Sequence, residues 1–351
     1  MIWLTWRQFR AQALVAAVIL AAAAAYLLVT GNQLRHAYAA DLASCVPQNS
    51  CFGVLNGLQT DYSGPRQLLE YLVLGAPALA GIFWGAPLIA GELERGTHHL
   101  VWNQSVTRTR WLAAKLAGVA LAAVATAGLL SLLLTWWAGP LDAASGNRWG
   151  TQAFNARDVT PLGYAAFAFT LGVALGLLVR RTVPAMAATL AIFIVVQILV
   201  TAAVRPHLMP ATTDAVAINQ STMASQAQRA DSSDAPTGPV TIDLAGQAGA
   251  WVLSESPVLG GAGRPVPSSE VATCWNRTFG QGPSRQGQGK GDSMGYGSLG
   301  ACLAPLDLHV DITYQPAARY WPLQWIETAL YAVLGALLAA ACFWRIRRFR
   351  G

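Results

Sequence analysis

Six runs of about 20 apolar residues constrain the fold of this chain more than any other feature. They lie at about 11–30, 68–90, 111–138, 161–179, 183–204 and 322–344. A helix needs roughly 20 residues to cross the hydrocarbon core of a bilayer, and a single segment in lipid must satisfy its own backbone hydrogen bonds. Charged residues make up only 11% of the 351 residues, against about 25% in an average soluble protein. The sequence therefore predicts an all-α integral membrane protein with six transmembrane helices.

Basic residues predict the orientation of these spans. With the N-terminus inside the cell, the short cytoplasmic segments carry more basic residues than the much longer outer ones, as the positive-inside rule requires. The inner basic residues are Arg7, Arg10, Arg95, Arg108, Arg110, Lys115, Arg180, Arg181, Arg345, Arg347, Arg348 and Arg350. The net charge of +6 thus reflects topology rather than a basic stripe for nucleic acid. Both ends are expected in the cytoplasm, and the predicted location is the bacterial plasma membrane.

The N-terminal segment, residues 1–10, interleaves aromatic with basic side chains. Trp3, Trp6, Arg7 and Arg10 precede the first apolar run. This pattern is typical of a short helix lying in the membrane interface, although an anchor with no further role would have the same composition. The apolar run is longer than the roughly 7–15 residues of a signal peptide core, so we expect an uncleaved span.

Residues 205–320 form the largest segment outside the predicted spans. Leu306–Tyr314 alternates apolar and polar residues, which predicts a β-strand. Cys45 and Cys51 share the first outer loop, and Cys274 and Cys302 share this larger segment. Two pairs in an oxidising compartment favour disulfides over free thiols, and their spacing does not suit a metal. We expect a small extracytoplasmic domain with some β structure between the fifth and sixth spans, acting as a receptor, a gate or a structural lid.

Catalytic motifs are not found in the sequence. No Gly-x-x-x-x-Gly-Lys-Ser/Thr phosphate loop occurs, and no nucleophile with a recognisable base or set of metal ligands stands out. Glu70 and Glu327 lie near the outer ends of their spans, where we expect their carboxylates to reach water. Gln197, in the middle of the fifth span, is expected to form a hydrogen bond between helices. The sequence therefore predicts neither an enzyme nor a proton-coupled carrier.

The segment 91–115, between the second and third spans, concentrates charge and helix-capping residues. Glu92 and Glu94 lie at the end of a span, Gly96-Thr97 can end one helix and begin the next, and Lys115 follows inside the third span. We expect a charged helix-turn-helix along the inner membrane surface that is suited to binding another protein. The alternative is a loop whose charges serve only to orient the spans.

This segment resembles the intracellular loop of type-2 ABC transporter permeases. The resemblance lies in the order acidic-x-acidic-Arg-Gly-Thr, then Leu100, then Ser-Val-Thr-Arg at 105–108 and a later lysine. Members often have a proline before the valine, which this chain lacks. The resemblance implies a coupling surface formed by Glu92, Glu94, Arg95, Gly96 and Thr97, with Arg108 and Lys115 at its far end.

The resemblance also implies a domain organisation and partners. It divides the chain into an interfacial helix (1–10), spans one to five (11–204) with a coupling loop (91–115), an outer domain (205–320), and the sixth span with a basic tail (321–351). The chain would be the permease of a bacterial exporter, in a homodimer or a heterodimer with a paralogue, surrounded by membrane lipid. A separate ABC subunit would bind ATP and Mg²⁺, and this chain would bind no cofactor. The alternative is a non-transporting immunity or sensor protein that uses the outer domain for recognition.

Overall fold

The computed structural model describes residues 2–44, 51–96, 107–145, 148–222, 249–267 and 293–348, together with Ser269, Val271, Thr273, Cys274 and Arg277. The chain divides into two compact units. The first, which we call the helical unit, comprises Met1–Ala40, Gly57–Met209 and Tyr320–Gly351, and the second, the sheet unit, comprises Asp41–Asn56 and Pro210–Arg319. Each unit is described by itself.

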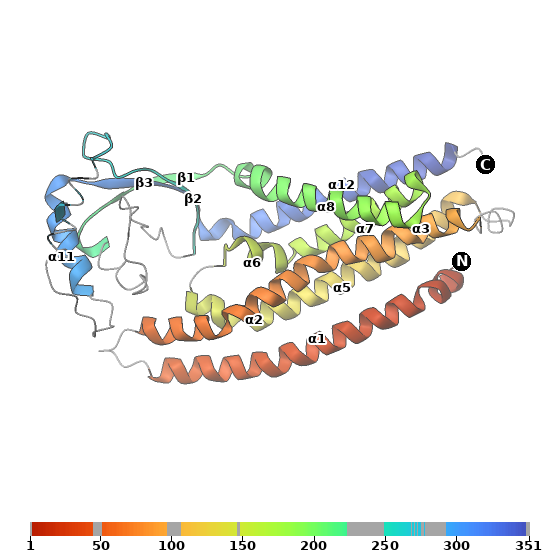
Figure 1. Cartoon of the computed structure of the whole chain (residues 1–351), viewed down its shortest axis with the longest axis horizontal. Helices are drawn as coiled ribbons and strands as arrows, with labels where there is room; N and C mark the ends of the chain where they lie inside the picture. Colours follow the sequence, from red (N-terminus) through yellow and green to blue (C-terminus); the bar gives the residue numbers. More distant parts are fainter. Residues whose placement is uncertain are drawn as a thin grey trace. The chain divides into compact units, whose positions relative to one another are not determined.

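The helical unit is built from long helices (Figure 1). In chain order these are α1 (Ile2–Ser44), α2 (Cys51–Ala80), the π-helix η1 (Gly81–Gly85), α3 (Ala86–Glu94), α5 (Arg108–Ser145), α6 (Thr151–Ala156), α7 (Thr160–Val179), α8 (Thr182–Leu199), the π-helix η2 (Val200–Val204), the 3-10 helix η3 (Arg205–His207) and α12 (Tyr320–Arg348). The last residues of α1, from 41, and the first residues of α2, to 56, belong to the sheet unit. Within the described residues, six helical stretches are long and apolar enough to cross a membrane. The six spans expected from the sequence are thus confirmed, and the chain is a multi-pass membrane protein.

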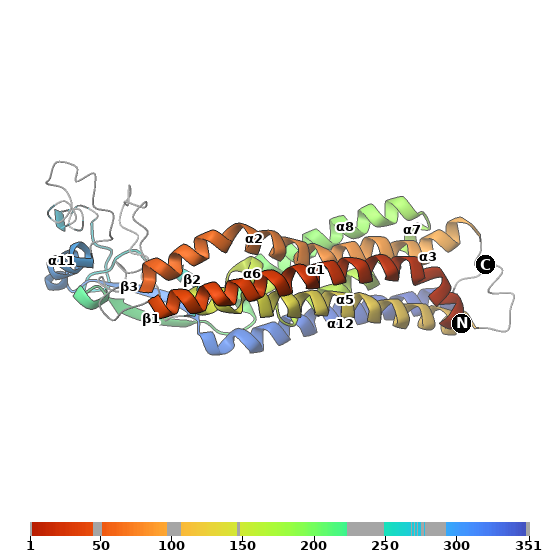
Figure 2. The same ribbon diagram turned by 90° about the horizontal axis from the view of Figure 1, so that it is seen from below.

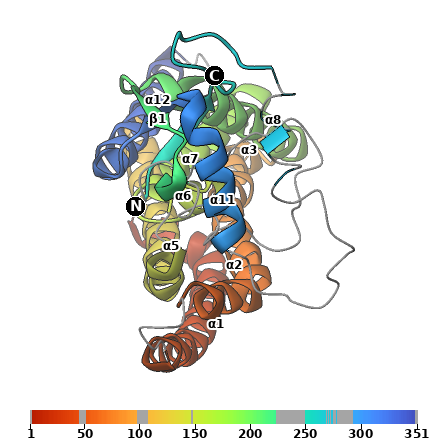
Figure 3. The ribbon, with the colours of Figure 1, turned by 90° about the vertical axis from the view of Figure 1, so that its left-hand side faces the viewer.

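Helix α7 lies at the centre of the helical unit. It packs against α12, α3, α5, η1 and α8, and the end-on view of Figure 3 shows it among these helices. Glycine permits the closest of these contacts, because a Cβ atom at Gly81 would lie 2.5 Å from the carbonyl oxygen of Ala168, and one at Gly85 2.5 Å from that of Phe169. Small residues that let two backbones approach are a common device of membrane helix packing. The π-helix η1 is thereby held directly against the backbone of α7.

Helix α1 lies at the edge of the unit, beside α2 and α5 (Figures 1 and 3). The location of residues 2–10 in the membrane interface stays a prediction, but these residues do not form a separate helix: they are the first turns of α1, which runs from Ile2 to Ser44 without interruption. The reason lies in the composition, since residues 1–30 contain neither glycine nor proline to end a helix. Figure 2 shows the helix bending near its N-terminal end.

The sheet unit contains three antiparallel strands in the order β1-β3-β2. These are β1 (Thr212–Ala217), β2 (Trp251–Glu255) and β3 (His309–Gln315), with helix α11 (Ser293–Leu303) and the 3-10 helices η4 (Ala304–Leu306) and η5 (Ala317–Arg319). Thr212 pairs with Tyr314, and Trp251 pairs with Gln315. Side chains from α11 and β3, including Leu299, Leu303 and Ile312, form its apolar core. The strand expected before the last span is confirmed as β3.

A disulfide joins Cys274 to Cys302 in the sheet unit. The two Cα atoms lie 5.8 Å apart, which is within the usual range for a disulfide. This confirms one of the two expected cysteine pairs. Cys45 and the Cys51 side chain lie outside the described residues, so the other pair remains a prediction.

Candidate functional site

The residues singled out in segment 91–115 lie at one end of the helical unit, which we call the motif end. Here α3 and α7 end, and α5 and α8 begin. Figure 1 shows the first turns of α1 and the last turns of α12 at this same end. Helix α3 stops at Glu94 because Gly96 adopts a positive φ of 70°, and its amide donates to the carbonyl of Leu93 at 3.3 Å. A left-handed glycine after the last helical residue is a common helix terminator.

Glu92 forms a buried ion pair at the motif end. The Lys115 Nζ atom on α5 donates to the Glu92 Oε1 atom. The two side chains are only 3% (Lys115) and 15% (Glu92) exposed. Lys115 Nζ also lies 5.0 Å from the centre of the Trp111 ring, within range of a cation–π interaction. Because charges inside a membrane protein are costly unless they are paired, this pair fixes the end of α3 to α5.

Glu94 contacts a different helix. Its Oε2 atom accepts hydrogen bonds from the backbone amide and the hydroxyl of Thr182, at 3.1 and 2.7 Å. Thr182 begins α8, so Glu94 caps the N-terminus of α8 from another helix. A carboxylate is favoured there because the first amides of a helix are unpaired and the helix dipole is positive. The end of α3 is therefore bound to α8 as well as to α5.

Arg95 borders a small polar cavity between α1, α3 and α5. The cavity has a volume of about 260 Å³ and is lined by Phe9, Gln12, Trp84, Pro87, Leu88, Gly91, Glu92, Arg95 and Lys115. Phe9 is 7% exposed, and its ring meets the edge of Trp84 with 5.2 Å between centroids. The structure thus brings Glu92, Arg95 and Lys115 together around one cavity, with a side chain from the N-terminal turns of α1 forming part of its wall.

For several of the predicted site residues the structure describes the backbone but not the side chain. Gly96 lies at the end of α3 and Arg10 is exposed on α1. Arg108 begins α5, and Trp3, Trp6 and Arg7 belong to the first turns of α1, but the described structure does not include their side chains. Thr97 lies outside the described residues. The complete set of predicted contacts at the loop therefore remains a prediction.

A second polar cluster lies at the opposite end of the helical unit, which we call the α6 end. Arg205 binds Glu327 of α12 with two hydrogen bonds, Nε to Oε2 at 2.7 Å and Nη2 to Oε1 at 2.8 Å. Tyr164 of α7 donates to the same carboxylate at 2.5 Å, and Asn155 of α6 accepts from Arg205. Glu327 is fully buried. This cluster joins η3, α6, α7 and α12.

Arg157, just after α6, forms the other half of the α6 end. Its guanidinium contacts Glu70 of α2 and, at 2.7 Å, Asp142 of α5. Burial opposes the charged form, but the carboxylates of Asp142 and Glu70 outweigh it, so that the pKa of Arg157 is raised above its ordinary value. Arg66 also pairs with Glu70, at 3.0 Å. Two carboxylates and two arginines thus connect α2, α5 and the segment after α6.

The expectation that Glu70 and Glu327 reach water is wrong. Their exposed fractions are 4% and 0%, because an arginine from an adjoining segment neutralises each one. The sequence does contain a signal for these buried pairs, because an arginine lies beside each of two apolar runs. Arg157 precedes residues 161–179, and Arg205 follows residues 183–204. Their position between apolar runs predicts outer loop charges for both. By contrast, the expected hydrogen bond of Gln197 between helices is confirmed, since Tyr331 of α12 donates to its Oε1 atom at 3.0 Å.

A comparison with protein-family models identifies the family of this chain. The family model described as "ABC-2 membrane transporter related" matches residues 17–205, a stretch that includes the described residues of segment 91–115 and most of the α6 end. Searches of curated proteins and of solved structures found no match. Because the family model covers more than half of the 351 residues, the chain belongs to the ABC-2 membrane transporter related family.

Proposed function

We propose that this chain is the permease subunit of a bacterial ABC exporter and that its motif end binds the ATPase. Membership of the family implies association with an ABC ATPase, and its membrane domains are typically non-catalytic. The family match also favours a transporter over the non-transporting alternative. The observation that carries the proposal is that Glu92 and Glu94, two residues apart, bind two different helices, α5 and α8.

These two contacts give segment 91–115 a way to move several spans together. A partner that displaces the end of α3 would pull α5 through the Glu92–Lys115 pair and α8 through the Glu94–Thr182 hydrogen bonds. At its other end α3 begins directly after η1, and π-helical segments frequently occur at functional sites within helices. Helix α3 would therefore act as a short lever between the ATPase and the centre of the bundle.

The proposal includes an orientation and an assembly. The motif end faces the cytoplasm, as the arginine distribution predicts, and the sheet unit lies outside the cell. Two permease chains, identical or paralogous, would form the transport path with two ATPase subunits. ATP and Mg²⁺ would be bound by the ATPase alone.

The proposal is tested by coexpressing the chain with an ABC ATPase encoded beside it. We expect the two proteins to copurify, with an ATP hydrolysis rate that differs from that of the ATPase alone and responds to amphipathic drugs or peptides. The double variant Glu92→Gln/Glu94→Gln should insert normally but lose this response. Asp61→Asn is the matched control, since Asp61 is an exposed carboxylate of α2 outside the motif end.

The double variant distinguishes a coupling role of Glu92 and Glu94 from the alternative that the charges of this loop serve only to orient the spans. An unaltered response in the double variant would remove the coupling role from these carboxylates. Failure of the chain to bind any ABC ATPase would overturn the proposed function itself.

A further inference from the structure

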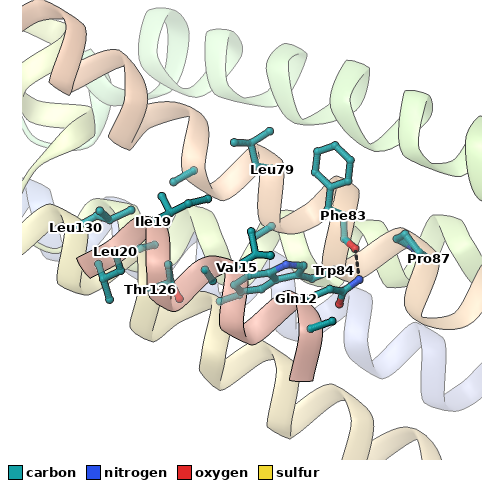
Figure 4. A pocket seen from close by; sticks show the side chains of 16 residues that line it. Gln12, Val15, Ile19, Leu20, Leu79, Phe83, Trp84, Pro87, Thr126 and Leu130 are labelled. Carbon is teal, nitrogen blue, oxygen red and sulfur yellow. Dashed lines mark hydrogen bonds between the residues drawn. The ribbon is translucent and has the colours of Figure 1, made fainter. Parts of the chain in front are cut away.

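A large apolar crevice opens between α1, α2, η1 and α5. Its volume is about 630 Å³, within the range of about 300–1,000 Å³ that is usual for ligand sites. Most of its lining is aliphatic or aromatic, including Val15, Ile19, Leu79 and Phe83. Figure 4 shows Leu20 and Leu130 toward one end of the crevice and Gln12, Trp84 and Pro87 toward the other.

Two polar side chains of the crevice, Gln12 and Thr126, form hydrogen bonds to the backbone. The Gln12 amide donates to the carbonyl of Phe83 at 3.3 Å, the contact drawn in Figure 4. The Thr126 hydroxyl donates to the carbonyl of Ala122 at 2.8 Å. The crevice therefore offers an apolar surface to an occupant, and its position among membrane-spanning helices makes a lipid chain the most available one.

The apolar crevice adjoins the polar cavity of the motif end. Gln12, Trp84 and Pro87 line both. The polar cavity carries Glu92, Arg95 and Lys115, which gives two positive charges and one negative charge. Lys115 is paired with Glu92. Arg95 interacts electrostatically with Glu94, but Glu94 does not line the cavity, is hydrogen-bonded to Thr182 and also interacts with Arg181. A net positive charge is thus available at the polar end of an apolar crevice.

The dimensions fit one leaflet of a bilayer. The crevice is lined on α1 from Ala11 to Leu20, a rise of about 14 Å in an α-helix. That is close to half of the hydrocarbon thickness of about 30 Å. An acyl chain in the crevice would therefore place its headgroup at Arg95.

From this juxtaposition we infer a binding site for an anionic phospholipid of the leaflet at the motif end. One acyl chain occupies the crevice between α1, α2 and α5, and the phosphate lies against Arg95 beside Lys115. Basic pockets between membrane helices are known to hold anionic headgroups. The site includes residues of the proposed coupling segment, but its existence does not depend on the proposed function.

Native mass spectrometry of the full chain, without an ATPase, tests this inference. The probes are phosphatidylglycerol and phosphatidylcholine with the same acyl chains, and oleic acid. We expect one phosphatidylglycerol per chain, bound about tenfold more tightly than phosphatidylcholine. Both lipids carry the phosphate, but the choline cation of phosphatidylcholine is repelled by the positive charges of Arg95 and Lys115. Arg95→Gln should abolish this preference, and Arg110→Gln, an exposed arginine of α5 that does not line either cavity, should retain it.

A second pair of variants tests the acyl crevice. Ala16→Phe fills it and should lower the occupancy of both phospholipids, whereas Ala17→Phe, on the next and exposed position of α1, should not. Ala76→Phe fills the crevice from α2 and gives the same readout if Ala16→Phe misfolds. Equal binding of the two phospholipids by the unaltered chain, or binding of oleic acid in their place, would overturn the inference. If the chain instead forms a dimer without bound lipid, and Ala16→Phe disrupts that dimer, the crevice is a contact surface for a second copy of the chain.

Discussion

The two ends of the helical unit use buried charge in different ways. At the α6 end, Glu327 is fully buried and accepts hydrogen bonds from Arg205 and Tyr164. At the motif end, the Oε1 atom of Glu92 accepts a hydrogen bond from Lys115, and Glu92 borders a cavity and keeps 15% of its side chain exposed. Glu94 is exposed, accepts hydrogen bonds from the first residue of α8 and interacts electrostatically with Arg181 and Arg95.

This difference indicates where the helical unit resists movement and where it permits it. At the α6 end, Glu327 and Arg205 together connect η3, α6, α7 and α12 through several hydrogen bonds. Separating Glu327 from Arg205 would leave two unpaired charges in a medium of low polarity. The contacts of the motif end join helices in pairs and lie beside water-accessible space. An external protein can therefore shift α3 at lower cost than it could shift the helices at the α6 end.

The largest expected effect comes from removing Glu327. The variant Glu327→Ala leaves Arg205 buried without its carboxylate, and we expect it to lower the free energy of unfolding by about 3–5 kcal/mol. Unfolding in mixed micelles measures this. The double variant Glu327→Leu/Arg205→Leu removes both charges and should recover much of the loss. A loss below about 1 kcal/mol in the single variant would show that the α6 end is not the rigid part of the unit.

An intermediate effect is expected for Lys115. Lys115→Met leaves Glu92 without its ammonium partner, but Glu92 borders a cavity that water can enter, so we expect a loss of about 1–3 kcal/mol. The same unfolding measurement applies, with Lys115→Met/Glu92→Met as the paired control. If Lys115→Met destabilises the chain more than Glu327→Ala does, the comparison between the two ends is reversed.

The smallest effect on stability is expected for Glu94. Glu94→Gln keeps the shape of the side chain but weakens the cap on α8, because a neutral oxygen accepts more weakly than a carboxylate. Hydrogen exchange should become faster at the first amides of α8 and remain unchanged at the start of α7, where Gln324 accepts from the Thr160 amide. Equal changes at both helices would point to a general loosening and not to a lost cap.

The sequence was sufficient to predict the spans but not their ends. Hydropathy located all six because the bilayer imposes one requirement on every span. It missed how far α1 and α2 extend, since α1 reaches Ser44 through residues such as Gln33 and Arg35 that are polar yet suited to a helix. Strand β3 was found because its alternation is local. Its partners β1 and β2 are set by contacts distant in sequence.

The motif end was predicted in part, for a similar reason. Glu92, Glu94 and Lys115 were identified by their place in a charged segment, but the pairing of Glu94 with Thr182 joins residues far apart in the chain. A Thr-Val-Pro sequence at 182–184 is typical of a helix start, and this was the signal for that contact. The α6 end does not follow from the sequence, because position alone places Arg157 and Arg205 in loops and their carboxylate partners lie far away in the chain.

Site-specific photocrosslinking tests the central claim most directly. A photoreactive residue at Arg95 or Arg110, both exposed at the motif end, should crosslink to the ABC ATPase in the membrane. The same residue at Thr151 or Trp321, exposed at the α6 end, should give no crosslink to it. Crosslinks to the ATPase from the α6 end, with none from the motif end, would contradict both the proposed binding surface and the proposed orientation.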